Sequence, residues 1–295
     1  MSDVYVVTKP LQYMVCDLIR GGGDASLIVV NMFFKSKSVY ERIKASGRWG
    51  RVYFCENRFS SFVAAAFLRP QRLFIDGDIG TRIFLYLALV KLLSPGVKIY
   101  VYEEGLGTYR SDIYRISRWR KLKAMFLNRF GVGTHFGGSF FCCGVYVFNP
   151  SRYLASVKIK SNFEVNKIAS SLVSYCGRDG KILKYLFTGE SDFKEKDAKC
   201  CIIYLSDWEL RDSAKNILLS FDETVFKVVK PHPHIFNYSE SWGGADWVVD
   251  GSLPAELLIL EAVSKYPEVI VFHHGSSVVS YVQAANLKYR LVEIG

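Results

Sequence analysis

Three histidines stand directly after predicted strands, where an imidazole can take part in binding or proton transfer. His232 follows the apolar run at residues 225–229 in a proline-stiffened loop, and His273 and His274 follow the run at 269–272. In an open α/β sheet, the loops at the carboxyl ends of the strands line the ligand crevice. We therefore expect these histidines to lie in a site; the alternative is that they are exposed turn residues without a ligand.

Gly275, Ser276 and Ser277 continue from two of those histidines into a helix predicted over residues 278–285. A glycine and two hydroxyl side chains at a helix N-terminus suit an anionic phosphate. They combine free N–H groups, the positive end of the helix dipole and two side-chain donors. A serine that only caps the helix is the alternative.

Two further strand ends carry polar groups of the same kind. Glu256 lies in the first turn of an apolar helix, after Pro254 and a short strand predicted at 246–250. Proline and an acid are both favoured in that turn. Ser206 follows the strand predicted at 201–205, where a nucleotide would be approached. With histidine and serine at the neighbouring strand ends, this half of the chain is predicted to bind a nucleotide.

An acidic pair, Glu103 and Glu104, follows the strand predicted at 98–102 and precedes Gly105. The glycine permits a sharp turn that can place one carboxylate over a cleft. A neighbouring carboxylate and partial burial raise a carboxyl pKa, as a general base near neutral pH requires. We expect Glu104 to be the base and Glu103 to be the second candidate; a solvated acidic turn is the alternative.

Asp76 and Asp78 form a rival acidic loop in the same half of the chain. Unlike Glu103 and Glu104, they are not adjacent in the sequence, so we consider them weaker candidates for the catalytic base. They also form the Asp-x-Asp pattern that a metal site could use. This pattern lies in the first half of the chain, whereas the predicted nucleotide-binding residues lie in the second. We therefore expect catalysis without a metal, and no cofactor.

These motifs together resemble the bacterial sialyltransferases of the two-domain kind, especially the lipooligosaccharide sialyltransferases and capsular polysialyltransferases. Those enzymes carry an acidic pair followed by Gly, then a His-Pro motif, then a Ser-Ser motif. The matching residues here, in the same order, are Glu103-Glu104-Gly105, His232-Pro233 and Ser276-Ser277. Glu256 resembles the family's ribose-binding glutamate, and residues 8–12 resemble its first strand-to-helix loop.

The resemblance implies two Rossmann-like domains facing across a cleft, the GT-B type, and inverting transfer of sialic acid from its CMP-activated form. A related nonulosonic acid could be the donor instead. The acceptor would be a hydroxyl of a bacterial surface glycan (lipopolysaccharide, O-antigen or capsule), free or lipid-linked. His232 and Pro233, together with Gly275, Ser276 and Ser277, would bind the departing CMP phosphate and stabilise its negative charge. A Kdo transferase that uses CMP-Kdo is the alternative enzyme.

The composition fits a globular protein with an anionic partner. The 295 residues are half apolar and carry a net charge of +10. No window approaches a membrane span, and the N-terminus lacks signal-peptide features, so we expect a cytoplasmic protein, peripheral on the inner membrane. A basic protein that binds membrane or nucleic acid without turnover is the non-enzymatic alternative. Nucleic acid is not an expected partner, because no recognised binding motif is present.

The positioning elements alternate regularly. Strands predicted at 4–7, 26–30, 51–54, 72–75 and 98–102 are separated by helical segments, which indicates βαβ units and a mostly parallel sheet. We expect domain 1–155 to hold the acceptor and the base, and domain 156–295 to bind the CMP donor, with the tail 283–295 crossing back.

Residues 115–130 carry basic residues around an apolar side with Trp and Phe. A helix of this kind is typical of a membrane-surface element, so an anionic membrane surface is a predicted partner. The alternative is a helix whose apolar side packs on the sheet and whose basic side is solvated.

Overall fold

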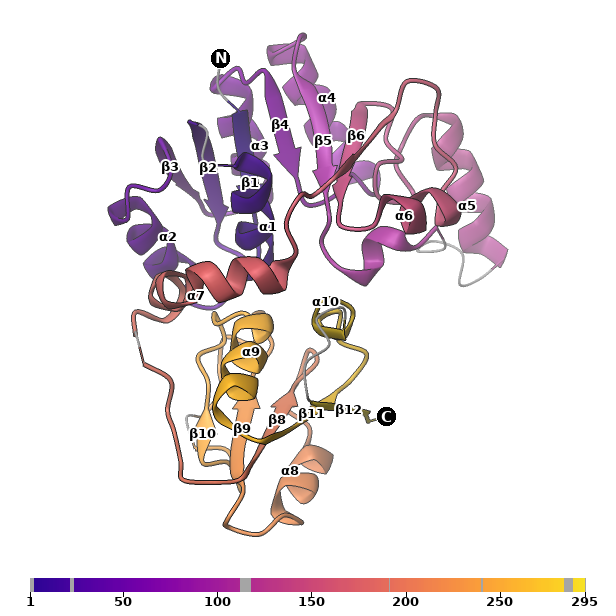
Figure 1. Cartoon of the computed structure of the whole chain (residues 1–295). Coiled ribbons are helices and arrows are strands. Elements are labelled where there is room, and N and C mark those ends of the chain that lie inside the picture. The colour runs from indigo at the N-terminus through magenta and orange to yellow at the C-terminus, as the bar shows by residue number, and fades with distance from the viewer. Residues whose placement is uncertain are drawn as a thin grey trace. The chain divides into compact units, whose positions relative to one another are not determined.

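A computed structural model describes residues 3–21, 24–111, 118–190, 192–239, 241–283 and 289–294. The chain divides into two compact units, which can be followed in Figure 1. The first unit consists of Met1–Met32 and Ile43–Ser170, and the second of Phe33–Arg42 and Ser171–Gly295. Each unit contains a parallel β-sheet with helices packed on it.

In the first unit, the described strands form a seven-stranded parallel sheet in the order β3-β2-β1-β4-β5-β6-β7. Strands β1 and β2 are buried almost throughout, as expected when helices cover both faces of a parallel sheet. The strand bounds are β1 Asp3–Val7, β2 Ala25–Val30, β3 Arg51–Cys55, β4 Arg72–Ile75, β5 Lys98–Tyr102, β6 Cys142–Val147 and β7 Glu164–Lys167. The helices are α1 Pro10–Arg20, α3 Arg58–Phe67, α4 Thr81–Leu93, η1 Leu106–Tyr109, α5 Arg118–Arg129 and α6 Pro150–Ser156, and α2 Ser36–Ala45 spans the division at Arg42.

In the second unit, the described strands form a five-stranded parallel sheet in the order β10-β9-β8-β11-β12. The strand bounds are β8 Cys200–Leu205, β9 Phe226–Lys230, β10 Trp247–Val248, β11 Glu268–His273 and β12 Arg290–Glu293. The helices are α7 Leu172–Thr188, α8 Asp212–Leu219, α9 Ala255–Lys265 and α10 Val278–Gln283. The three middle strands are buried along nearly their whole length; β8 and β11 are largely apolar runs, and β9 also buries Lys227 and Lys230.

The strand order reverses once in each sheet, between β1 and β4 in the first and between β8 and β11 in the second. At such a reversal, the loops after the two strands leave the sheet in opposite directions and open a crevice that ligands occupy. The loops of interest are therefore those that follow β1 and β4, and those that follow β8 and β11.

The α/β class and the two Rossmann-like units are confirmed. The cleft between them stays a prediction. The units divide at Ser170 rather than at 155, because β7 pairs in parallel with β6 of the first sheet. In the tail at 283–295, β12 pairs with β11 of the second sheet, while residues 284–288 and 295 lie outside the described part.

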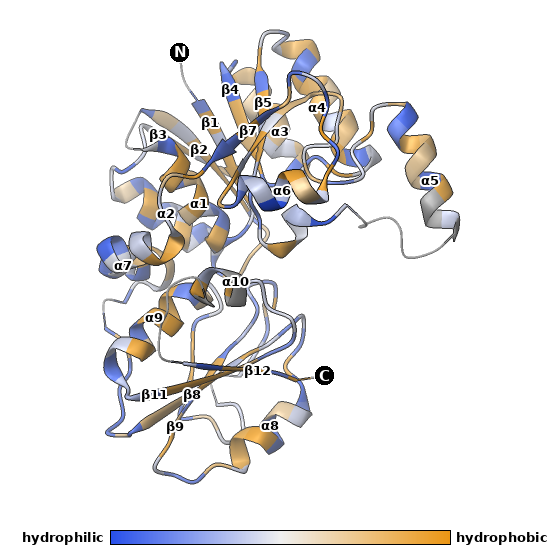
Figure 2. Ribbon diagram, turned by 45° about the vertical axis from the view of Figure 1, so that its right-hand side comes forward, coloured by the Kyte–Doolittle hydropathy of each residue, from blue (hydrophilic) through white to orange (hydrophobic). Residues whose placement is uncertain are grey.

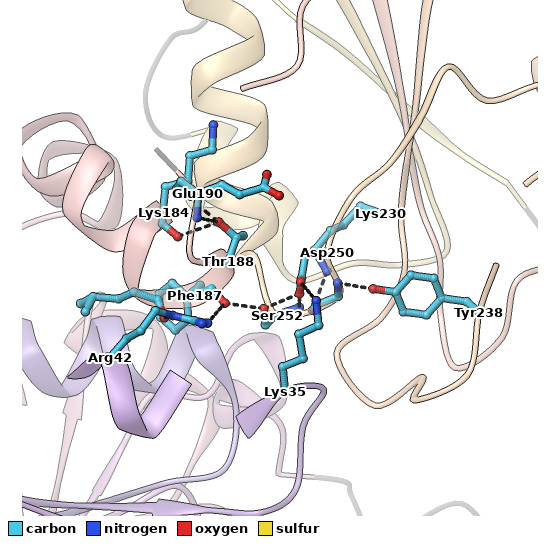
Figure 3. A network of polar contacts seen from close by, with 12 residues as sticks. Lys35, Arg42, Lys184, Phe187, Thr188, Glu190, Lys230, Tyr238, Asp250 and Ser252 are labelled. Atoms are coloured by element: carbon cyan, nitrogen blue, oxygen red, sulfur yellow. Dashed lines mark hydrogen bonds and ion pairs between the residues drawn. The ribbon is translucent and has the colours of Figure 1, made fainter. Parts of the chain in front are cut away.

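The segment Phe33–Arg42 belongs to the second unit although the sequence placed it in the first domain. Arg42 donates hydrogen bonds to the carbonyls of Leu186 and Phe187, at 2.8 and 2.7 Å. Lys35 forms an ion pair with Asp250 at 2.7 Å, as Figure 3 shows. These contacts are distant in sequence, so local patterns could not have predicted them.

Within the described ranges, no helix combines the length and the apolar character needed to cross a bilayer.

Candidate active site

The reversal point of the first sheet is lined by a buried carboxylate with three partners. Asp76, after β4, accepts hydrogen bonds from Thr8 Oγ1 at 2.8 Å and from Gln12 Nε2 at 3.2 Å. Arg58, in the first turn of α3, forms an ion pair with the same carboxylate. A buried carboxylate needs such partners, so Asp76 is a fixed part of the site rather than a free acid.

Glu104 extends from the end of β5, the strand beside β4. Its Oε1 lies 2.8 Å from Lys9 Nζ, and the Lys9 and Glu104 side chains are 27% and 25% exposed. The Glu104 backbone N–H donates to Thr108 Oγ1 at 3.0 Å, which fixes the turn at Gly105, where φ is +134°. Glu104 is thus held in place and partly open to solvent, as a catalytic carboxylate must be.

Electrostatics around Glu104 favour its use as a base. Burial raises the pKa of the Glu104 carboxyl above its ordinary value, and this outweighs the neighbouring Lys9, which lowers it. The negative charge of Asp76 raises the pKa further, and Arg58 opposes that effect. A carboxylate with a raised pKa is a better proton acceptor near neutral pH than an ordinary surface acid.

Glu103, the second candidate base, is buried and engaged in the interior. It accepts hydrogen bonds from the Tyr109 hydroxyl and, at 2.7 Å, from the backbone N–H of Phe148. These bonds tie η1 to the end of β6. Its contacts are those of a structural residue, and Glu104 is the member of the pair that faces solvent.

The rival acid Asp78 also has a structural position. It is fully buried and accepts backbone hydrogen bonds from Gly137 at 2.8 Å and Ser139 at 2.7 Å. Burial raises its pKa to about 6. Among the residues that the structure describes, no cluster of three or more His, Cys, Asp or Glu could hold a metal ion; that catalysis needs no metal stays a prediction.

In the second unit, Ser206 and His232 meet at the ends of the adjacent strands β8 and β9. The His232 backbone N–H donates to Ser206 Oγ at 2.8 Å, and the Ser206 N–H donates to the Lys230 carbonyl at 3.1 Å. Pro233, in the same loop, accepts from the Phe34 N–H at 2.8 Å. The loop that carries His232 is therefore anchored on both sides.

Trp208 forms an aromatic platform with two histidines of that loop. Its ring centroid lies 4.8 Å from His232 and 5.2 Å from His234, and the Trp208 and His234 rings are parallel within 1°. The Trp208 side chain is nevertheless 71% exposed. An indole held on one side and open to solvent can stack on a planar ligand.

The loop after β11 carries the predicted phosphate residues at the reversal point of the second sheet. Gly275 has φ +64°, a left-handed conformation that favours glycine. Ser276 and Ser277 are both half-buried and precede α10, and Ser276 Oγ accepts from the Val278 N–H at 3.4 Å. The described part of α10 ends at Gln283.

The two histidines of this loop differ in their surroundings. His273 is buried, and burial lowers its pKa below the ordinary imidazole value. His274 is half-buried, and its Nε2 lies 3.2 Å from the Tyr204 hydroxyl on β8. The structure therefore brings Ser206 and His232 into contact, and the loop at 273–277 follows β11, the other neighbour of β8 in the sheet.

Glu256 lies apart from solvent, in the first turn of α9. It is 5% exposed, and burial raises its pKa to about 7. The nearby Lys230 is also buried, and burial lowers its pKa to about 8. Its Nζ donates to the carbonyls of Pro231 and, at 3.0 Å, Gly251, within the network drawn in Figure 3. Glu256 is therefore more buried, and more readily protonated, than the expected ribose-binding carboxylate.

Three residues of these sites were not expected from the sequence. They are Arg58, Lys230, which lies between the predicted strand at 225–229 and the His-Pro motif, and Trp208, which follows Ser206 in its loop. For Arg58, the available signal was its position at the start of the helix that follows the predicted strand at 51–54. For Lys230 and Trp208, the partners are distant in sequence or exposed, and no local pattern marks them.

No family model matches the sequence, and no curated protein matches it. Among solved structures, the chain is similar to one described as "Crystal Structure Analysis of the Glycotransferase of kitacinnamycin", with a TM-score of 0.46 and 11% sequence identity. The similarity covers 99% of this chain and 86% of the other.

Proposed function

We propose that the protein is an inverting glycosyltransferase that moves sialic acid, or a related nonulosonic acid, from its CMP-activated form to a hydroxyl of a bacterial surface glycan. The observation that carries the proposal is the position of Glu104. It is a partly exposed carboxylate of raised pKa at the carboxyl edge of a Rossmann-like sheet. The sequence resemblance to bacterial sialyltransferases supports the choice of donor.

On the acceptor side, Glu104 takes the proton of the attacking hydroxyl. The hydroxyl oxygen forms a bond to the anomeric carbon of the sugar as the bond from that carbon to the CMP phosphate breaks. Burial raises the pKa of Glu104 and so makes the carboxylate a stronger base, while Lys9, 2.8 Å away, favours its ionised form. Asp76 and Arg58 hold the surrounding loops in position.

On the donor side, the departing CMP phosphate gains negative charge as the bond to the sugar breaks. Ser276, Ser277 and the N–H groups after Gly275 are suited to hydrogen-bond that phosphate. His232 is suited to donate a hydrogen bond or a proton to the same group. Because these donors are positioned before the reaction, they stabilise the charge that develops in the transition state.

Trp208 supplies a surface for the cytosine ring. One side of the indole lies against the histidine rings, and 71% of the residue is exposed. Stacking of a base on an aromatic side chain contributes roughly 1–3 kcal/mol and does not require a hydrogen-bond pattern. A planar base next to the phosphate donors fits a nucleotide monophosphate.

Removing both hydroxyls of the Ser-Ser motif should weaken the binding of CMP. We expect the Ser276→Ala, Ser277→Ala double variant to lose about tenfold or more in affinity, because hydrogen bonds to a charged group contribute roughly 1.5–3 kcal/mol each. Glu256→Ala should also weaken the binding of CMP, because the resemblance to sialyltransferases assigns the ribose to this residue. Isothermal titration calorimetry with CMP measures both effects.

The matched control is Ser264→Ala, which removes an exposed hydroxyl of α9. Its CMP affinity should equal that of the wild type. If neither the double serine variant nor Glu256→Ala changes the affinity for CMP, the nucleotide site does not lie at these loops.

A further inference from the structure

Helix α4 is apolar on its outer side as well as its inner side. Ile83, Leu87 and Val90 face the core and are buried. On the opposite side, Leu85 and Leu92 are 60% and 76% exposed. A helix that is apolar all round is ordinarily buried, in a protein core or in lipid, so its exposure here needs an explanation.

The neighbouring helix α3 continues this surface. Phe59 and Phe67 lie two turns apart and are 50% and 74% exposed. The Phe59 ring lies 5.4 Å from Tyr86 of α4, so the two exposed rows adjoin. Figure 2 shows hydrophobic residues along both helices.

Helix α5 exposes the apolar side that the sequence predicted, over its described residues Arg118–Arg129; residues 115–117 lie outside the description. Trp119 is 82% exposed, Met125 70% and Phe126 64%. This side therefore does not pack on the sheet, which removes the alternative of an ordinary core-facing helix.

A run of aromatic contacts joins α4 to α5. Phe84 of α4 lies 5.0 Å from Phe141, and Phe140, which is 71% exposed, donates its N–H to the Gly131 carbonyl at 2.7 Å. Gly131 directly follows Phe130, whose ring lies 4.8 Å from Phe126. These contacts link α4, the loop at 130–141 and α5, and we refer to the exposed apolar residues of α3, α4, this loop and α5 together as the apolar face.

The charges around this apolar face are mostly positive, with Glu56, just before α3, as an exposed acid beside it. Residues 57–98 contain two acids, Asp76 and Asp78, and both are buried; residues 113–163 contain none. Exposed cations on the same elements include Arg82, Lys123 and Arg129. An apolar surface on elements that carry an excess of cations complements an anionic lipid headgroup layer, with side chains reaching into the acyl boundary.

We propose that the apolar face of the first unit docks the protein on an anionic membrane surface, with α3 and α4 contributing as well as α5. This inference is independent of the donor nucleotide. If the acceptor glycan is lipid-linked, the same face keeps the enzyme at the surface that carries it.

The test is flotation of the full chain with vesicles of phosphatidylcholine, with and without phosphatidylglycerol. We expect binding to the anionic vesicles that weakens as salt is added, because surface charge attraction is screened. The Leu85→Ser, Leu92→Ser double variant should lose about tenfold or more in vesicle affinity, since each exposed leucine contributes burial energy only when lipid covers it. Its affinity for CMP should not change.

The matched control is Leu219→Ser with Ile182→Ser, which removes leucine and isoleucine side chains that are 61% and 46% exposed in the second unit. This variant should bind vesicles as the wild type does. The proposal is overturned if the α4 variant keeps full vesicle affinity, or if binding does not depend on anionic lipid. It is also overturned if the wild type binds no vesicles and the α4 variant instead converts an oligomer to a monomer in light scattering.

Discussion

Glu104→Gln is expected to lower kcat by about 10²–10⁴-fold, the usual range for the loss of a general base, and to leave the affinity for CMP unchanged. Glutamine keeps the size of the side chain and its contact with Lys9 but accepts no proton. In the wild type, activity should fall as the pH is lowered through the pKa of Glu104, because only the carboxylate is a base. Since burial raises that pKa, the decline should begin above the ordinary carboxyl range.

Two variants control this result. Glu56→Gln changes an exposed carboxylate after β3 and should leave kcat unaffected. Glu103→Gln should instead lower the free energy of unfolding, because Glu103 accepts two hydrogen bonds in the interior. Near-normal turnover of Glu104→Gln, with the acidic limb of the pH–rate profile retained, would remove Glu104 from the role of base.

The second large effect is expected at His232. His232→Ala should lower kcat by about 10²–10³-fold, because it removes the donor to the departing phosphate, while acceptor binding is kept. Steady-state kinetics with CMP-sialic acid measure the loss of kcat, and the KM for the acceptor should stay unchanged.

His234→Ala is the matched comparison, because both rings lie against Trp208 in the same loop. His234 stacks parallel to the indole, which indicates a packing role and a much smaller effect on kcat. If His234→Ala or His273→Ala is inactive while His232→Ala is active, the assignment of the His-Pro motif in this loop is wrong.

Most strands could be located from the sequence because they are local features. Runs such as those of β4, β5 and β8 are apolar, rich in β-branched and aromatic residues, and bounded by glycine, proline or charged residues. The runs of β5 and β11 placed Glu104 and the Ser276-Ser277 pair after strand ends. The topology rule for open sheets then indicated that they belong to sites.

The elements and contacts that could not be predicted depend on residues that are distant in the sequence. Strands β7 and β12 are short and lie at the sheet edges, and no apolar run distinguishes them. Helix α7 contains Gly177 and Gly180, which weaken its helical pattern. The ion pair of Arg58 with Asp76 and the burial of Glu256 depend on residues far away in the chain, so neither has a local signature.

The proposed transferase activity can be measured as the release of CMP from CMP-sialic acid, with and without a panel of galactosides and sialosides, in the presence of a chelator. We expect that an acceptor accelerates CMP release, that a sialylated product forms in equal amount, and that Glu104→Gln abolishes both. Acceptor-dependent turnover with CMP-Kdo and not with CMP-sialic acid would contradict the assignment of sialic acid as the donor sugar. The absence of turnover with either nucleotide sugar would contradict the proposed transferase activity itself.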